Sequence, residues 1–273
     1  MDLLCPVCAL PLRPDGGSYR CENRHCYDKA KEGYVNLLAG TRSGDSTGDN
    51  RAMALARRSF LSKGYFDTLL HAVETLLQKN CPPGGEVLDI CCGEGYYSTA
   101  LQARNSRFSY TGFDLSREMV RLAAKRKSDI TYFVANLMHI PLPDASIDFA
   151  FHLFAPFNEE EFFRVLKPGG TLVTAVAGDR HLWQLKEVLY DEPYLNDEKP
   201  PKTLRQPAKT LRTAATIALP CREDIGNLLK MTPYFYHTPS EGLRRLEEKE
   251  ALETEISFVL YVYEKEANDG TGH

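Results

Sequence analysis

The sequence predicts an α/β fold with a doubly wound, mostly parallel sheet, preceded by a small cysteine-rich module. From Glu86 onward, short apolar segments alternate with amphipathic ones, a pattern typical of a sheet covered by helices on both faces. Four of the 8 cysteines lie within the first 26 residues. With 273 residues, the chain is long enough for one large domain and one small one.

The composition argues against membrane-bound and secreted proteins. The longest nearly apolar run, from Ile147 to Phe157, is interrupted by Asp148 and His152 and falls short of the ~18 apolar residues that a membrane helix needs. The first residues lack the basic and apolar segments of a signal peptide. The net charge of −4 gives no global attraction to nucleic acid. We therefore expect a cytoplasmic protein without a membrane span.

Three regions differ in composition. Residues 1–38 hold the cysteine cluster and a tight-turn signal, Pro14-Asp15-Gly16-Gly17. Residues 39–50 are rich in Gly, Ser, Thr and Asp, as flexible linkers are. Residues 51–273 open with two helical patterns, over 53–61 and 66–77, and continue into the alternating region. This division predicts a small domain, a linker and a large domain.

The alternating region predicts a series of strands and helices. We expect strands over 86–90, 108–113, 131–134, 147–154 and 171–177, and helices over 94–103, 116–127, 159–166 and 181–189. Residues 191–220 are Pro-rich and are expected to be irregular. Residues 255–263 alternate and predict a late strand, antiparallel at one edge of the sheet.

The cysteine cluster has the spacing of a metal site. Cys5 and Cys8 form one CxxC knuckle, and Cys21, His25 and Cys26 supply the second. Two such knuckles joined by a hairpin bring four soft ligands to one tetrahedral point, which Zn²⁺ prefers. A closed four-ligand site is structural, because no position is open to water. The spacing alone leaves His25 and Cys26 as rivals for the fourth position, and buried free thiols or redox chemistry as other readings.

A glycine-rich turn follows the first strand of the alternating region. Cys91-Cys92-Gly93-Glu94-Gly95 comes directly after Val87–Ile90, so the backbone can approach a ligand closely. A dinucleotide site needs a third small residue where this chain has Tyr96 and Tyr97. The acidic Asp89 repels phosphate. Gly93, Glu94 and Gly95 therefore favour a cationic ligand without phosphates, such as S-adenosylmethionine.

Polar residues end the next two strands in the order that such a cofactor requires. Asp114 ends the second strand, 21 residues after Gly93, where a carboxylate accepts both ribose hydroxyls. Asn136 and Leu137 follow the third strand, where an amide side chain and its backbone can read an adenine edge. Each residue taken alone has an ordinary structural explanation. Asp114 is equally typical of a helix cap, and Asn136 of a turn.

Other candidates lie beyond the later strands. Phe154 and Phe157 follow the fourth strand and could sandwich a flipped base, although core aromatics are as good a reading. His181 opens a helix and could touch the cofactor carboxylate or cap the helix. His152 and Glu94 are candidate bases on position alone, so the catalytic residue is left unassigned.

Basic residues gather in two places. Six Lys/Arg and no acid lie between Lys199 and Arg222, a stretch that reads either as a solvated face or as a nucleic-acid patch. The cysteine-rich module contributes a second set of cations, namely Arg13, Arg20, Arg24, Lys29 and Lys31.

These residues resemble a known family. The CPVC knuckle, DKAKEGYVNLL at 28–38, ARRSFL at 56–61 and VLDICCGEGYY at 87–97 are similar to the bacterial 23S rRNA (guanine-N1)-methyltransferases of the RlmA type, which include tylosin-resistance enzymes. FDLS at 113–116, LKPGG at 166–170, RHL at 180–182 and MTP at 231–233 extend the resemblance along nearly the whole chain.

The resemblance implies a Rossmann-like class I methyltransferase sheet behind an N-terminal zinc ribbon. It implies Cys5, Cys8, Cys21 and His25 as zinc ligands, and S-adenosylmethionine contacts at Gly93–Gly95, Asp114, His181 and Phe66. It also implies a homodimer that binds a hairpin of 23S rRNA. Family members usually carry Gly where this chain has Cys91. A small side chain preserves the site unless the backbone there needs a positive φ.

The expected function is methyl transfer from S-adenosylmethionine to N1 of a guanine in a 23S rRNA hairpin. A small-molecule methyltransferase keeps the fold but leaves the zinc module unexplained. A zinc-ribbon RNA-binding protein with an inert methyltransferase domain is the alternative from another class, and Cys91 is the residue that favours it.

Overall fold

The computed structural model describes residues 2–38 and 51–267. The predicted linker, 39–50, lies outside the described residues. In chain order, the elements are β1 (Arg13–Asp15), β2 (Ser18–Arg20), β3 (Cys26–Asp28), β4 (Val35–Asn36), α1 (Arg51–Leu61), α2 (Asp67–Asn80), β5 (Glu86–Ile90), α3 (Tyr96–Arg104), β6 (Ser109–Asp114), α4 (Arg117–Ala124), β7 (Thr131–Val134), β8 (Ile147–Leu153), α5 (Glu159–Val165), β9 (Leu166–Ala177), α6 (Trp183–Leu189), β10 (Lys209–Leu219), α7 (Arg222–Lys230), α8 (Tyr234–His237), α9 (Ser240–Glu247) and β11 (Leu252–Glu264).

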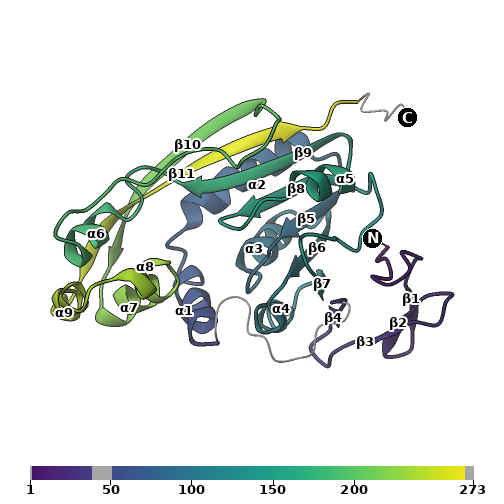
Figure 1. Ribbon diagram of the computed structural model, residues 1–273, viewed down its shortest axis with the longest axis horizontal. Coiled ribbons are helices and arrows are strands. Elements are labelled where there is room, and N and C mark those ends of the chain that lie inside the picture. The colour runs from purple at the N-terminus through teal and green to yellow at the C-terminus, as the bar shows by residue number, and fades with distance from the viewer. Residues whose placement is uncertain (1, 39–50, 268–273) are drawn as a thin grey trace.

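One sheet of eight strands organises the molecule (Figure 1). Its order is β10-β11-β9-β8-β5-β6-β7-β4, with the strands from β4 to β9 parallel and β10 and β11 antiparallel. The strand order reverses at β5, which pairs with β6 on one side and β8 on the other. In such sheets the crevice beyond the carboxyl ends of the strands at this switch point is where ligands bind.

Apolar side chains cover both faces of the sheet. Leucines and valines of α2, α3, α4 and α6 pack in one cluster with β5, β9 and β11. The phenylalanines of α5 pack on the opposite face. The doubly wound arrangement expected from the alternation is therefore confirmed. Ser116 caps α4 as its position predicts, accepting the Met119 N–H at 3.4 Å.

The N-terminal module packs against the second face of the sheet. Strands β1, β2 and β3 form a small antiparallel sheet of their own. Leu3 and Leu12 join the same apolar cluster as α5, and the Leu4 N–H donates to the Pro141 carbonyl at 2.9 Å. Strand β4 then pairs with β7 and becomes one edge of the large sheet. The two parts of the chain thus share a core.

Two expectations about the C-terminal region need correction. Residues 209–219, expected to be irregular, form the edge strand β10, and residues 222–247 form three helices. Strand β11 is antiparallel as expected, but β10 covers it, so it is not an edge strand. The apolar Ala214 and Ala218 on the exposed side of β10 and the polar Thr213 on its inner side blur its alternation. Among the described residues, no helix is long and apolar enough to cross a membrane.

Candidate metal centre and cofactor site

The cysteine-rich module brings four ligand atoms to one point. The Nδ1 atom of His25 lies 3.5, 3.5 and 3.4 Å from the Sγ atoms of Cys5, Cys8 and Cys21. The Cys8 and Cys21 Sγ atoms are 3.6 Å apart. All four atoms lie within 4.8 Å of one another. These are the edge lengths of a tetrahedron whose centre is a zinc-ligand distance, about 2.0–2.3 Å, from each corner.

Neighbouring residues suit a zinc thiolate centre. The Tyr27 hydroxyl lies 3.2 Å from the Cys5 Sγ atom, and such outer-shell donors orient metal ligands. Burial opposes ionisation of Cys5, yet Tyr27 and backbone N–H groups lower its thiol pKa to about 6. Cys26 is exposed at the start of β3 and is absent from the ligand cluster found among the described residues.

The glycine-rich turn bends sharply after β5. Cys91, Gly93 and Gly95 all have positive φ, at 59°, 55° and 79°. A Cβ atom at Gly95 would lie 2.7 Å from the Ala123 Cβ atom and 2.9 Å from the Tyr132 hydroxyl, so only glycine fits. A Cβ atom at Gly93 would meet nothing within 4 Å. The turn therefore leaves open space above Gly93, where a ligand can approach the backbone.

Two buried acids lie at this turn, and their partners differ. Asp89 is buried, and its Oδ2 atom has no hydrogen-bond partner among the described residues. Burial raises the pKa of Asp89 to about 8, although hydrogen bonds from Ser98 act in the opposite direction. Glu94 is also buried, but it forms an ion pair with Arg126, whose Nε atom lies 2.9 Å from the Glu94 Oε2 atom. Both line a small cavity of about 40 Å³ beside Gly93.

Asp114 connects the ends of β5 and β6. Its Oδ2 atom accepts the Gly93 N–H at 3.0 Å, and its Oδ1 atom accepts the Ser116 N–H at 2.8 Å. Asn136 is exposed and accepts the Met138 N–H at 2.9 Å, which is the turn geometry of this residue type. Leu137 follows it and is half-buried. The predicted strand-end residues thus lie on three neighbouring parallel strands, as the order of β5, β6 and β7 requires.

Phe66 and His181 lie together, although 115 positions separate them in the chain. Their ring centroids are 5.6 Å apart, and both residues line a cavity of about 580 Å³. His181 Nδ1 accepts the Ser257 N–H of β11 at 3.2 Å, which leaves Nε2–H as the donor of the neutral ring. Burial lowers the pKa of His181 to about 4. Phe154 lines both this cavity and the small one beside Gly93.

Comparisons with known proteins fit these two sites. Residues 87–170 match the model of a methyltransferase domain, and residues 3–41 match the N-terminal zinc ribbon of RlmA. A Streptomyces fradiae protein, 23S rRNA (guanine(748)-N(1))-methyltransferase, is 31% identical over 257 residues that cover 90% of each chain.

The chain belongs to the family of 23S rRNA (guanine-N1)-methyltransferases. A Bacillus subtilis relative, whose name gives a 23S rRNA (guanine-N1) activity provisionally, is 29% identical over 94% of this chain and 95% of its own. Among solved structures, a SAM-dependent methyltransferase from Aquifex aeolicus is 25% identical over 47% of this chain and 68% of its own, with a TM-score of 0.36.

The cofactors of the chain are S-adenosylmethionine and a structural zinc ion. The residues present fit both groups. Three thiols and one imidazole are the soft ligands that zinc takes. The open space at Gly93 and the unpartnered oxygen of Asp89 fit a cationic cofactor without phosphates.

The basic stretch from Lys199 to Arg222 is largely neutralised. Four of its six cations form ion pairs with acids from outside or beside it: Lys199 with Asp197, Arg205 with Glu159, Arg212 with Glu198, and Arg222 with Glu250. Lys202 and Lys209 form no ion pair with the described residues. The stretch therefore offers a smaller positive surface than its sequence suggests.

Sequence reasoning missed the residues that hold the Phe66–His181 cavity in shape. The Asn196 side chain donates to the Gly178 carbonyl at 2.9 Å and to the His181 carbonyl at 3.2 Å. It also accepts from the buried Lys186 ammonium at 2.6 Å. Asn196 lies in the Pro-rich segment after α6, where no periodic pattern marks it.

Proposed function

We propose that the chain transfers a methyl group from S-adenosylmethionine to N1 of a guanine in a hairpin of 23S rRNA. The observation that carries this proposal is the match to the Streptomyces fradiae enzyme, which spans the zinc ribbon and the methyltransferase domain alike. S-adenosylmethionine supplies a methyl group that its sulfonium has already activated. The protein then has to align the two reactants and exclude water.

The cofactor site that we propose extends along the carboxyl ends of β5, β6 and β7. The backbone of Gly93–Gly95 contacts the cofactor, Asp114 accepts the ribose hydroxyls, and Asn136 and Leu137 contact the adenine. Asp89 and Glu94 face the turn from the buried side. Phe66 and His181 contact the amino-acid part of the cofactor, because the N–H of a neutral imidazole can donate a hydrogen bond to its carboxylate.

The metal site that we propose consists of Cys5, Cys8, Cys21 and His25. Its role is to fold residues 1–38, which have little apolar core of their own. We propose residues 39–50 as the linker and 51–273 as the methyltransferase domain.

Neither candidate base suits the removal of the guanine N1 proton. Burial lowers the pKa of His152 to about 4, and Glu94 is held in its ion pair with Arg126. An efficient general base has a pKa near the working pH. We therefore propose that the N1 proton leaves to solvent, as one H⁺ for each methyl group transferred.

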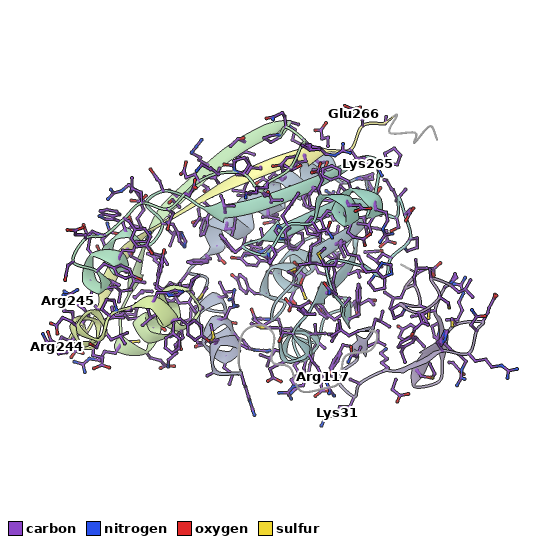
Figure 2. All side chains as sticks on the ribbon, in the orientation of Figure 1. Lys31, Arg117, Arg244, Arg245, Lys265 and Glu266 are labelled. Carbon is purple, nitrogen blue, oxygen red and sulfur yellow. The ribbon has the colours of Figure 1, made fainter. Side chains whose placement is uncertain are left out.

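Exposed cations on both parts of the chain support capture of RNA phosphates. Arg24, Lys29 and Lys31 lie on the surface of the zinc module, and Lys31 is labelled at its outer side in Figure 2. Arg13 and Arg20 pair with Asp2 and Asp15 and contribute less. We also propose that the chain acts in the cytoplasm as a homodimer. Light scattering on the purified protein tests its oligomeric state.

The test of function is transfer of radiolabelled methyl from S-adenosylmethionine to 23S rRNA, with the product located by primer extension. Methylation at N1 blocks base pairing, so reverse transcription should stop at one hairpin guanine. Label in a small molecule but not in RNA would favour the small-molecule alternative. Failure to bind the cofactor would favour the inert RNA-binding alternative.

A further inference from the structure

A cavity of about 510 Å³ remains unexplained by the cofactor site. It lies at the carboxyl ends of β8 and β9 and is lined by residues of both strands, of the loop after β8 and of segment 199–202. None of the predicted cofactor residues lines it. It shares Phe154 with the Phe66–His181 cavity and with the small cavity beside Gly93. The cavity therefore adjoins the methyl-donor site without belonging to it.

Two buried polar side chains lining this cavity have unpartnered atoms. His152 and Thr174 are neighbours in the pairing of β8 with β9, so both side chains stand on the same face of the sheet. Their exposed fractions are 2% and 1%. Neither His152 Nδ1 nor Thr174 Oγ1 has a hydrogen-bond partner among the described residues. Buried polar atoms are rarely left unpaired in proteins, so two of them on side chains that line one cavity are candidates to bind a polar ligand.

The chemistry of the two atoms is defined by their surroundings. His152 Nε2 lies 2.9 Å from the Pro156 carbonyl, which can only accept, so Nε2 carries the proton and Nδ1 is an acceptor. Burial keeps the ring neutral, since it lowers the pKa of His152 to about 4. The Thr174 hydroxyl can donate. The cavity thus presents one acceptor and one donor on adjacent strands, which lie about 4.8 Å apart.

We propose that this cavity holds the guanine to be methylated, with His152 and Thr174 reading its sugar edge. In this arrangement the exocyclic N2–H of guanine donates to His152 Nδ1, and the Thr174 hydroxyl donates to N3. The opposite assignment, to N1 and O6, would bury the reacting nitrogen against the sheet. Reading N2 and N3 leaves N1 free to face the methyl donor.

Other features of the cavity suit a flipped nucleotide. The Phe154 ring is 44% exposed at the boundary with the cofactor cavities, and an exposed aromatic ring offers a stacking surface to a base. Phe157 also lines the cavity, but it is half-buried and its ring packs against Phe162. Lys202 lines the far side, where its ammonium suits a backbone phosphate. Adenine has no N2 amino group, so His152 is a specificity-determining residue for guanine.

The inference rests on the proposed function, and its test separates the two. The substrates are two synthetic RNA hairpins that carry guanosine or inosine at the position located by primer extension. Inosine lacks only the N2 amino group. The wild-type protein should methylate the guanosine hairpin with a kcat/KM about tenfold higher, the value of one hydrogen bond. His152→Leu should lower kcat/KM for guanosine about tenfold and bring the two substrates to parity.

Thr174→Val is a shape-matched variant that removes only the hydroxyl. It should lower kcat/KM for both hairpins by a similar factor and keep the preference for guanosine. His152→Asn, whose amide oxygen replaces the Nδ1 acceptor, should restore part of the preference, and it also serves if the leucine variant fails to fold. His71→Leu, on the exposed side of α2, is the matched control and should change nothing. Cofactor affinity, measured by calorimetry, should be the same in all variants.

The outcomes are distinct. A wild-type protein that binds the cofactor but methylates neither hairpin contradicts the proposed function. A wild-type protein that methylates both hairpins equally well, or a His152→Leu variant that keeps the preference for guanosine, overturns the inference and leaves the proposed function intact. A Thr174→Val variant with unchanged kcat/KM also overturns it.

Discussion

The backbone of Cys91 has a conformation that suits glycine better than cysteine. Its φ of 59° places it in the left-handed region, where a Cβ atom crowds the carbonyl oxygen. A small side chain is compatible with this position unless the turn needs a positive φ, and the structure shows that it does. A non-glycine residue held in such a conformation costs about 1–3 kcal/mol and persists only where its surroundings enforce it.

Replacing Cys91 by glycine should therefore stabilise the protein. We expect Cys91→Gly to raise the free energy of unfolding by about 1 kcal/mol, because the relief of strain exceeds the entropy that glycine adds to the unfolded chain. Thermal and urea unfolding measure it. The matched control is Cys91→Ala, which removes the sulfur but keeps the strain, and it should give no gain. Equal gains in both variants would show that the thiol, rather than the backbone, carries the cost.

Asp89 should couple cofactor binding to pH. Its pKa is raised from 3.8 to about 8, so its contribution to stability is complete below pH 3.8 and is lost as the pH rises through 8. A cationic cofactor favours the ionised carboxylate. Binding of S-adenosylmethionine should therefore release a proton near pH 7, and affinity should increase from pH 6 to pH 8.

Calorimetry in two buffers of different ionisation enthalpy measures the released proton. Asp89→Asn cannot release one, so its binding enthalpy should be the same in both buffers. Proton release that persists in the variant would assign the linkage to another group.

At the scale of elements, the cofactor site depends on how β5 and β6 end side by side. Asp114 ends β6 and accepts the Gly93 N–H of the neighbouring turn. We expect Asp114→Ala to weaken S-adenosylmethionine binding at least tenfold, because the variant loses both an acceptor for the ribose and the restraint on the turn. Calorimetry measures the affinity. Asp129→Ala, at an exposed position after α4, is the control and should leave it unchanged.

The elements that sequence patterns predicted are those with one buried and one exposed side, or with no exposed side at all. The strands over 86–90 and 131–134 have the predicted bounds, since their apolar runs are short and bounded by turn residues. Strand β10 escaped prediction because Ala214 and Ala218 on its exposed side and Thr213 on its inner side blur the alternation. Its packing partner, β11, also lies more than 30 residues later. Long-range pairing of this kind leaves no local signal.

The contrast between local signals and long-range contacts also applies to the candidate sites. The proposed zinc ligands lie within 21 residues and the glycine-rich turn is one continuous segment, so the sequence showed both features, although the spacing alone left His25 and Cys26 as alternatives. The placing of His152 beside Thr174, or of Asn196 beneath His181, depends on the register of strands and the path of an irregular segment. Those neighbours required the fold.

At the scale of the whole molecule, the zinc module and the large sheet are joined but have separate sources of stability. The module contributes β4 and the leucines at 3 and 12 to the shared core. We expect its own hairpins to depend on the proposed metal site. We expect Cys8→Ser to unfold the module up to about residue 30 and to spare S-adenosylmethionine binding. Hydrogen exchange measures the first effect and calorimetry the second.

A chelator should have the same effect on the wild-type protein, and Cys26→Ser, outside the ligand cluster, should have none. Loss of cofactor binding in Cys8→Ser would show that the two parts fold as one unit and would contradict the proposed domain division.

The position of β11 sets the order in which the protein can be completed during synthesis. This strand follows all the other described elements in the chain, yet it lies between β9 and β10 and supplies the Ser257 N–H that holds His181. Its Phe258 ring also contacts Phe66 at a centroid distance of 5.2 Å. A nascent chain that has emerged only as far as α9 thus has an open edge at β9 and lacks the β11 residues that pack against Phe66 and His181. We therefore expect the Phe66–His181 cavity to form only once β11 has paired with β9.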